Sequence, residues 1–83
     1  MKLASLTALV AAIEEGSLRG AARRLNISQP ALTKMLRALE VELSATLLTR
    51  TSKGVKPTEQ GKALHARALT VTRELKLATD EIS

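Results

Sequence analysis

Apolar residues recur at steps of three and four over most of the 83-residue chain, and short polar breaks separate the periodic segments. Such spacing places the apolar side chains along one side of an α-helix. It predicts helices over about residues 2–15, 18–25, 29–43 and 58–83. A chain of this length supports one small domain with one modest core, so the pattern predicts a single, mainly helical unit.

The third predicted helix, residues 29–43, has the most informative pattern. Its apolar stripe consists of Leu32, Met35, Leu36, Leu39 and Leu43. Ser28 can cap its first turn, where Pro30 is also well tolerated. At about 100° per residue, a polar arc lies away from this stripe and carries Gln29, Thr33, Lys34 and Arg37. An amide, a hydroxyl and two cations near a helix start suit base edges and phosphates in a DNA major groove, although a solvated polar face is commoner for an isolated helix.

The segment before this helix strengthens the DNA interpretation. Gly16 can end the first helix, Ser17 can cap the second, and Asn26 can adopt the left-handed geometry of a tight turn. The second helix has an inner face of Leu18, Ala21, Ala22 and Leu25, while Arg19, Arg23 and Arg24 are expected to point outward. A short helix, a brief turn and a longer helix form a helix-turn-helix pattern, which helical hairpins of other functions share.

Two short β-capable runs, residues 47–50 and 55–56, flank a polar turn with Gly54 and predict a small hairpin. Beside a helix-turn-helix, a basic hairpin is typical of a wing, in which Arg50, Lys53 and Lys56 could reach the DNA backbone or minor groove. An ordinary solvated turn is the alternative. The predicted fold class is therefore a mainly α winged helix-turn-helix, with three helices and a β-hairpin wing over residues 1–57. A long linker and dimerisation helix over residues 58–83 follows it.

The long helix carries an apolar seam with heptad spacing. Its members are Leu64, Ala68, Val71, Leu75, Ala78 and Ile82. Such a seam needs a partner, either the first helix of the same chain or the same helix of a second chain. A two-fold dimer is favoured because a helix this long extends beyond so small a core.

Composition and charge narrow the classes of function. The chain has no Phe, Tyr, Trp or Cys, so its core is aliphatic and it has no disulfides or thiolate chemistry. Residues 19–56 hold eight Lys or Arg against two Glu, a net charge of +6, whereas the remainder sums to −1. This concentration of positive charge indicates a nucleic-acid partner, and the missing aromatic residues argue against recognition of single-stranded RNA. No apolar run approaches a membrane span, so we expect no membrane partner and a soluble, cytoplasmic protein associated with the nucleoid.

The sequence offers no convincing catalytic or metal-binding set. His65 is the only histidine, and it is expected to be exposed on the long helix. The acidic pairs lie near helix ends or on predicted solvent faces, at Glu14 and Glu15, Glu40 and Glu42, and Asp80 and Glu81. The glycines form no phosphate-binding loop. No enzyme activity, metal site or cofactor is predicted.

Several short motifs, in this order and at these distances, resemble the N-terminal domain of LysR-type transcriptional regulators. They are Gly16-Ser17-Leu18, Ala21-Ala22 with Leu25, Ser28-Gln29-Pro30-Ala31-Leu32-Thr33, Leu39-Glu40 with Leu43, Leu47-Leu48-Thr49-Arg50, and Pro57-Thr58-Glu59-Gln60-Gly61. The resemblance spans nearly the whole chain. It implies that base contacts come from Gln29, Pro30, Thr33 and Lys34, and backbone or wing contacts from Ser28, Arg37, Arg50 and Lys53.

The resemblance also implies partners. A homodimer, or a tetramer of the full-length protein, would bind double-stranded DNA, and its two-fold symmetry predicts an inverted-repeat operator. A small-molecule effector would act only through a C-terminal domain absent from this chain. The alternatives are a protein-interaction module that pairs through the long helix and a binder of structured RNA.

Three positions depart from the usual family pattern. Ser44 replaces a common helix-ending glycine, Leu48 replaces a common aromatic residue, and Thr33 stands where serine is frequent. The extra methyl group of Thr33 could contact thymine and alter base preference.

Overall fold

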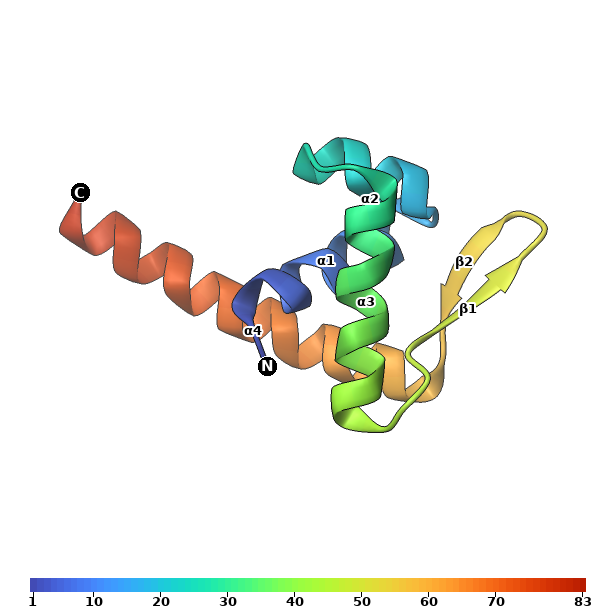
Figure 1. Ribbon diagram of the computed structural model, residues 1–83. Helices are drawn as coiled ribbons and strands as arrows, with labels where there is room; N and C mark the ends of the chain where they lie inside the picture. The colour runs from blue at the N-terminus through green and yellow to red at the C-terminus, as the bar shows by residue number, and fades with distance from the viewer.

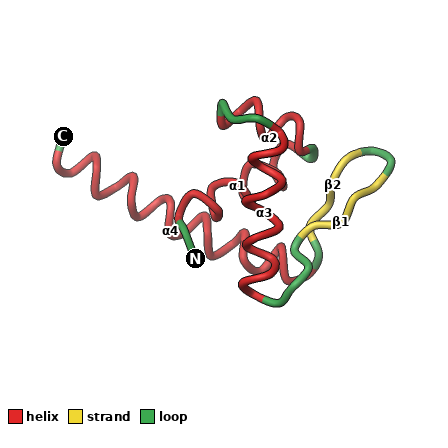
Figure 2. The backbone as a smooth tube through the Cα atoms, in the orientation of Figure 1, coloured by secondary structure: helices red, strands yellow, loops and turns green.

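The computed structural model describes residues 1–83 as four helices and one two-stranded antiparallel sheet. The elements in chain order are α1 (Leu3–Glu15), α2 (Leu18–Leu25), α3 (Gln29–Leu43), β1 (Leu48–Thr51), β2 (Gly54–Pro57) and α4 (Glu59–Ile82). The first three helices and the start of α4 form a packed body, from which the hairpin and the rest of α4 project on different sides (Figures 1 and 2). No helix is both long and apolar enough to cross a membrane.

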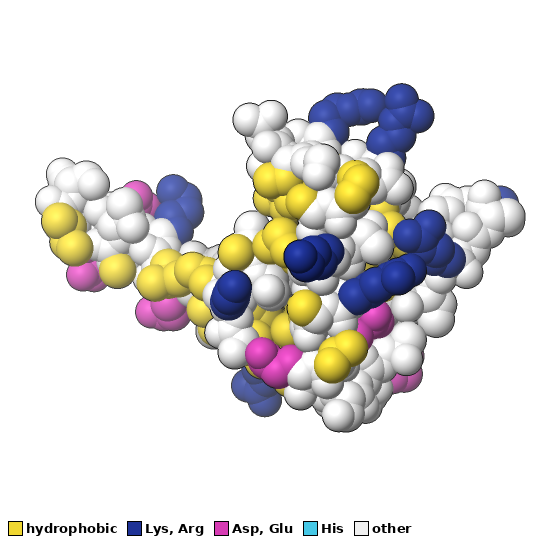
Figure 3. Space-filling view, in the orientation of Figure 1, with side chains coloured by type: hydrophobic (Ala, Val, Ile, Leu, Met, Phe, Trp, Pro, Cys, Tyr) yellow, Lys and Arg dark blue, Asp and Glu magenta, His cyan; other side chains and the backbone are white.

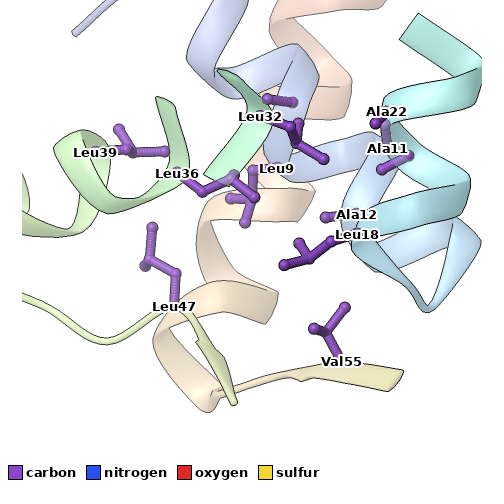
Figure 4. Packing of buried hydrophobic residues seen from close by; sticks show 12 residues of the cluster. Leu9, Ala11, Ala12, Leu18, Ala22, Leu32, Leu36, Leu39, Leu47 and Val55 are labelled. Atoms are coloured by element: carbon purple, nitrogen blue, oxygen red, sulfur yellow. The ribbon is translucent and has the colours of Figure 1, made fainter. Parts of the chain in front are cut away.

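The core is aliphatic throughout and lies where α1, α2 and α3 meet the base of the hairpin (Figure 4). Leu9 and Leu32 are completely buried, and Leu47 and Val55 extend the core from the hairpin side. Full burial stabilises a leucine side chain by about 1.5–3 kcal/mol relative to exposure. The core also contains small side chains of α1 and α2, which let helices approach closely, namely Ala8, Ala11, Ala12, Ala21 and Ala22.

Local caps form the helix-turn-helix that the sequence predicts. Gly16 ends α1 in the left-handed region with φ 70°, and the Ser17 hydroxyl accepts the Gly20 N–H at 2.9 Å to start α2. Asn26 turns the chain with φ 57°, and the Ser28 hydroxyl accepts the Ala31 N–H at 3.2 Å to start α3. These bonds satisfy N–H groups that have no partner within a helix, so both helix starts are defined locally.

The hairpin is attached to the turn between α1 and α2. The strands pair Arg50 with Val55 and Thr51 with Gly54, and the Val55 N–H also donates to the Gly16 carbonyl oxygen at 3.0 Å. Gly54 has φ 131°, and a Cβ there would overlap that same carbonyl oxygen. Only glycine suits this position, because the backbone conformation and the close approach both exclude a side chain. The direction of the hairpin is therefore fixed at its second strand.

The start of α4 is fixed by hydrogen bonds of Thr58 and by a close backbone approach at Gly61. The Thr58 hydroxyl accepts the Gly61 N–H at 3.0 Å and donates to the Thr46 carbonyl at 2.6 Å, while the Thr58 N–H donates to the Leu47 carbonyl at 3.0 Å. A Cβ at Gly61 would overlap the Leu47 carbonyl oxygen. Gly61 in the first turn of α4 thus permits the close approach of the chain that enters β1.

The predicted seam on α4 divides between two environments. Leu64 packs against the core, and Ala68 is 1% exposed where α4 lies along α1. Beyond this point the helix leaves the body, and Val71 and Leu75 are 42% and 46% exposed. Ala78 and Ile82 are exposed as well. The expectation that all six seam residues face a second chain is corrected for Leu64 and Ala68, because their own chain covers them.

One further expectation about α3 is corrected, and the structure shows how the helix ends at Ser44. Leu43 is exposed, because the last turn of α3 runs past the core and the buried stripe ends at Leu39. Ser44 ends α3 in the left-handed region with φ 50°, so the turn keeps the geometry that glycine adopts easily. A serine in this region bears a steric cost of the order of 1 kcal/mol.

Candidate nucleic-acid interface

The polar arc predicted on α3 forms one open surface hollow. Its lining consists of Gln29, Pro30, Thr33, Lys34 and Arg37, with no other residue. Thr33 is half-buried and the other four are exposed. On the opposite side of the helix, Leu32, Leu36 and Leu39 are buried in the core. The leucine stripe therefore holds the amide, the hydroxyl and the two cations outward.

A second hollow connects this surface to the hairpin. It brings Arg50 of β1 into one lining with Thr33 and Arg37 of α3. The floor is apolar and includes Leu18, Leu36, Leu48 and Val55. The face of α3 and the inner edge of the hairpin are thus one continuous surface, so a single extended ligand can contact both.

Ser28 and Lys53 lie outside these two hollows. Ser28 is exposed, and its hydroxyl oxygen already accepts the Ala31 N–H, which leaves its own O–H as the group available to an outside acceptor. Lys53 lies in the exposed turn at the tip of the hairpin, where its N–H donates to the Thr51 hydroxyl at 3.1 Å. This bond orders the backbone of the turn and leaves the Lys53 ammonium group free.

Positive charge gathers over α2, α3 and the hairpin on the face that Figure 3 shows. Four cations on or beside the two hollows form no ion pair, namely Lys34, Arg37, Arg50 and Lys53. By contrast, Lys62 pairs with Glu59 at 3.2 Å and Lys76 with Asp80 at 3.5 Å on α4. The unpaired cations are the ones available to neutralise an anionic ligand.

The remaining cluster of charge braces the body and does not join this surface. Arg24 of α2 pairs with Glu14 and Glu15 of α1 at 2.8 and 3.3 Å. The hydrogen bond from Arg24 lowers the pKa of Glu14, and the same bond raises the pKa of Arg24. Arg24 is thus engaged within the protein, whereas Arg19 and Arg23 of α2 are exposed and unpaired.

His65 corrects another expectation. It is half-buried and not exposed, and its Nε2 lies 3.6 Å from a Glu14 carboxylate oxygen without a hydrogen bond. It lies on the side of α4 that packs on α1, a relation that spacing along α4 alone does not reveal. No three carboxylate, imidazole or thiol groups converge on a common point that could hold a metal ion.

Sequence reasoning also missed the place of Glu40. Its carboxylate is not on a free solvent face, because it accepts the N–H groups of Leu47 at 2.7 Å and Leu48 at 3.3 Å. One signal was available, since Glu40 lies four residues after Leu36 and therefore close to the apolar stripe of the helix. Its partners are backbone groups, however, and these leave no mark on the sequence.

A helix-turn-helix whose second helix exposes a polar face beside a basic hairpin defines the class of winged helix-turn-helix proteins. The model for the lysR family of bacterial regulatory helix-turn-helix proteins matches residues 3–62. The chain belongs to this family, which confirms the resemblance seen in its motifs.

Curated relatives are similar over nearly the whole chain. The nitrogen assimilation regulatory protein nac of Klebsiella aerogenes is 44% identical over 78 residues, which cover 94% of this chain and 26% of that protein. The hydrogen peroxide-inducible genes activator of Haemophilus influenzae is 43% identical over 83 residues, or 100% of this chain and 28% of that protein. The chain therefore spans about a quarter of the length of these relatives.

Solved structures share the fold and confirm the predicted fold class. The BenM DBD in complex with catB site 1 DNA has a TM-score of 0.94 and 34% identity, covering 99% of this chain and 91% of that chain. The CbnR DBD in complex with DNA has a TM-score of 0.90 and 32% identity, covering 98% and 93%. Full-length CbnR complexed with its target DNA has a TM-score of 0.89, and the match covers 28% of that chain.

Proposed function

We propose that this chain is the DNA-binding domain of a bacterial LysR-type transcriptional regulator and binds double-stranded DNA with sequence specificity. The observation that carries the proposal is the hollow on α3, where all the polar groups of one helix face lie outward and next to the basic hairpin. DNA complexes of proteins with this fold support it. The named relatives are a regulatory protein and an activator of genes, which supports a role in binding rather than in catalysis.

In this proposal the front of α3 reads bases in the major groove. Gln29 can make two hydrogen bonds to adenine, and Lys34 can donate to the acceptor atoms of guanine. The Thr33 hydroxyl can bond a base edge while its methyl group contacts thymine. Pro30 adds an apolar contact in the first turn of α3, where its missing N–H has no role.

The backbone contacts come from the margins of the same surface. Arg37 and Arg50 share the second hollow and can contact phosphates on either side of the groove. Lys53 at the hairpin tip can reach the backbone or the minor groove, and the Ser28 hydroxyl can donate to a phosphate oxygen. These contacts hold the protein in register but do not read sequence.

We further propose that two chains pair through the part of α4 that leaves the body. Its exposed apolar side chains include Val71, Leu75, Leu77 and Ile82. Pairing there would cover this surface and relate two copies of α3 by a two-fold axis. The operator is then an inverted repeat with half-sites about 34–36 Å apart or a multiple of that distance. Effector binding and a tetramer would involve the part of the relatives outside this chain.

The proposal is tested by selecting operators from a pool of randomised duplexes and titrating the selected inverted repeat by fluorescence anisotropy. Gln29→Ala should reduce discrimination at one base pair in each half-site by about 1–3 kcal/mol, or about 5- to 150-fold. The matched control is Gln60→Ala, which removes the same side chain from an exposed position on α4.

Three results would contradict the proposal. Equal binding to the selected repeat and to unrelated duplexes would remove sequence specificity. Tighter binding to structured RNA than to any duplex, or no nucleic-acid binding together with a stable complex through α4, would support the two alternatives. An unchanged preference in Gln29→Ala would remove only the assignment of that residue.

A further inference from the structure

We propose that Glu40 is a positioning residue that holds the hairpin wing in register with α3. The proposal rests on the DNA-binding function proposed above, because it concerns how two parts of that surface are kept together. One oxygen of the Glu40 carboxylate accepts the N–H of Leu47 at 2.7 Å and that of Leu48 at 3.3 Å. Leu48 is the first residue of β1, so Glu40 joins α3 directly to the wing.

Leu47 makes this joint a link between three elements. Its N–H bonds to Glu40 on α3, its carbonyl accepts the Thr58 N–H at the start of α4, and its side chain is 2% exposed in the core. Gly61 lets the first turn of α4 lie against the same carbonyl. A shift of the Leu47 backbone would therefore move the wing and α4 relative to α3.

The rest of the wing has few other attachments to α3. The second strand is held at Gly16 through the Val55 N–H, which fixes it to the turn between α1 and α2. The first strand carries Arg50 and leads to Lys53, and the two bonds to Glu40 are the hydrogen bonds that connect its start with α3. The loss of these bonds should leave the hairpin paired while the placement of its cations becomes less defined.

Electrostatics alone predicts the opposite effect of removing Glu40. Its carboxylate lines the hollow that Arg37 and Arg50 share, and a negative charge there repels phosphate. If Glu40 acted only as a charge, its removal would strengthen DNA binding. If it positions the wing, its removal weakens binding despite the more favourable net charge.

The experiment compares Glu40→Ala with Glu40→Gln in the full chain, using the selected duplex at 50 and 200 mM salt. Both variants lose the charge, but glutamine keeps an oxygen that can accept the two N–H groups. We expect Glu40→Gln to bind nearly as well as the parent chain and Glu40→Ala to bind more weakly. The matched control, Glu42→Ala, removes an equal charge from an exposed position of α3, where the carboxylate pairs with the Met1 amino group at 3.1 Å and not with the wing.

A double-mutant cycle with Lys53→Ala separates positioning from a general loss of stability. In the parent chain, Lys53→Ala removes one phosphate contact from each of two bound chains, which should make the salt slope shallower by about 1.8 and change the ratio of affinities at the two salt concentrations by about 12-fold. In the Glu40→Ala background this effect of Lys53→Ala should disappear, because the wing no longer places the ammonium group. A purely structural role would lower the melting temperature but leave the Lys53 effect intact.

Four outcomes would overturn the proposal. DNA binding by Glu40→Ala as tight as that of the parent chain would show that Glu40 does not position the wing. Tighter binding than the parent by both Glu40→Ala and Glu40→Gln would favour the charge explanation. An undiminished Lys53 effect in Glu40→Ala would show that the wing is positioned by other contacts. Equal hydrogen-exchange rates of the Leu47 and Leu48 amides in the DNA-free parent and Glu40→Ala chains would show that the hydrogen bonds to Glu40 do not order this backbone. If the parent chain binds no duplex, the proposed DNA-binding function is refuted instead. Amide exchange at Leu47 and Leu48 would then still test whether Glu40 holds the start of β1.

Discussion

The salt dependence of DNA binding can be worked out from the unpaired cations of the structure. Arg37, Arg50 and Lys53 are the residues that we propose contact phosphates, and they form no ion pair within the chain. Each neutralised phosphate contributes about −0.9 to the slope of log Kobs against log salt, so three contacts in each of two chains give about −5.4. If Lys34 also lies near a phosphate, the slope approaches about −7.2. Affinity should then fall by about 10³- to 10⁴-fold between 50 and 200 mM salt.

The assay is an anisotropy titration of a selected inverted-repeat duplex at five salt concentrations. The double variant Arg50→Ala/Lys53→Ala should make the slope shallower by about 3.6 for two bound chains. The control variant Lys62→Ala/Lys76→Ala removes two cations that are paired with carboxylates on α4. This control has the same net charge as the double variant and should leave the slope nearly unchanged.

A slope shallower than about −2 in the parent chain would refute this assignment, because it would leave no room for the proposed phosphate contacts. An equal change of the salt slope in the double variant and in its control would also refute the assignment. It would show that overall net charge, and not the surface formed by α3 and the hairpin, determines the attraction.

Three further predictions concern stability and assembly. Leu32→Ala should lower the free energy of unfolding by about 2.7–5.0 kcal/mol and the melting temperature by more than about 10 °C, because Leu32 is fully buried. Val41→Ala on the exposed side of α3 should change stability by less than about 0.5 kcal/mol in the same thermal melts, and equal losses would contradict the burial pattern. Leu75→Glu should shift sedimentation toward the monomer, since pairing would bury a charge, and an unchanged dimer would indicate another interface. Arg24 lowers the pKa of Glu14 below 4.5, so this ion pair stabilises the fold above that pH and its contribution is lost as pH falls through the folded-state pKa. The ion pair should contribute at most about 1 kcal/mol to the free energy of unfolding. The difference in melting temperature between the parent chain and Glu14→Gln should therefore shrink below about pH 4.5, and a constant difference would contradict the pairing.

Local chemistry explains why much of this fold could be predicted from the sequence. Ser17, Ser28 and Thr58 each cap a helix three residues before the N–H that they accept, so one side chain and a fixed spacing define each start. Gly16 and Asn26 adopt left-handed geometry for reasons that also act within a few residues. The polar arc of α3 was predictable because helical periodicity gives the angle of every side chain relative to the buried stripe.

The errors occurred where a residue depends on a partner distant in the sequence. Periodicity showed that His65 and Glu40 lay off the main apolar stripes, but the groups opposite them come from α1 and from the backbone before β1. The same limit applies to Leu64 and Ala68, since a heptad pattern shows that a helix has an apolar side without showing what covers it. The family could be identified from sequence motifs alone, whereas these contacts depend on the three-dimensional arrangement of the elements.

The division of α4 explains how one helix can serve both parts of the proposed assembly. Its first turns are fixed to the body through Thr58, Leu64 and Ala68, so the body determines the direction of the helix. From Val71 to Ile82, a length of about 18 Å at 1.5 Å per residue, it projects with an exposed apolar side. If two such segments pair, the distance and angle between the two copies of α3 depend on where the segments cross, because α4 is one continuous helix from the body to Ile82. A substitution that moved the crossing by one heptad, about 10 Å along α4, would therefore change the preferred spacing of the half-sites without altering any residue that touches DNA.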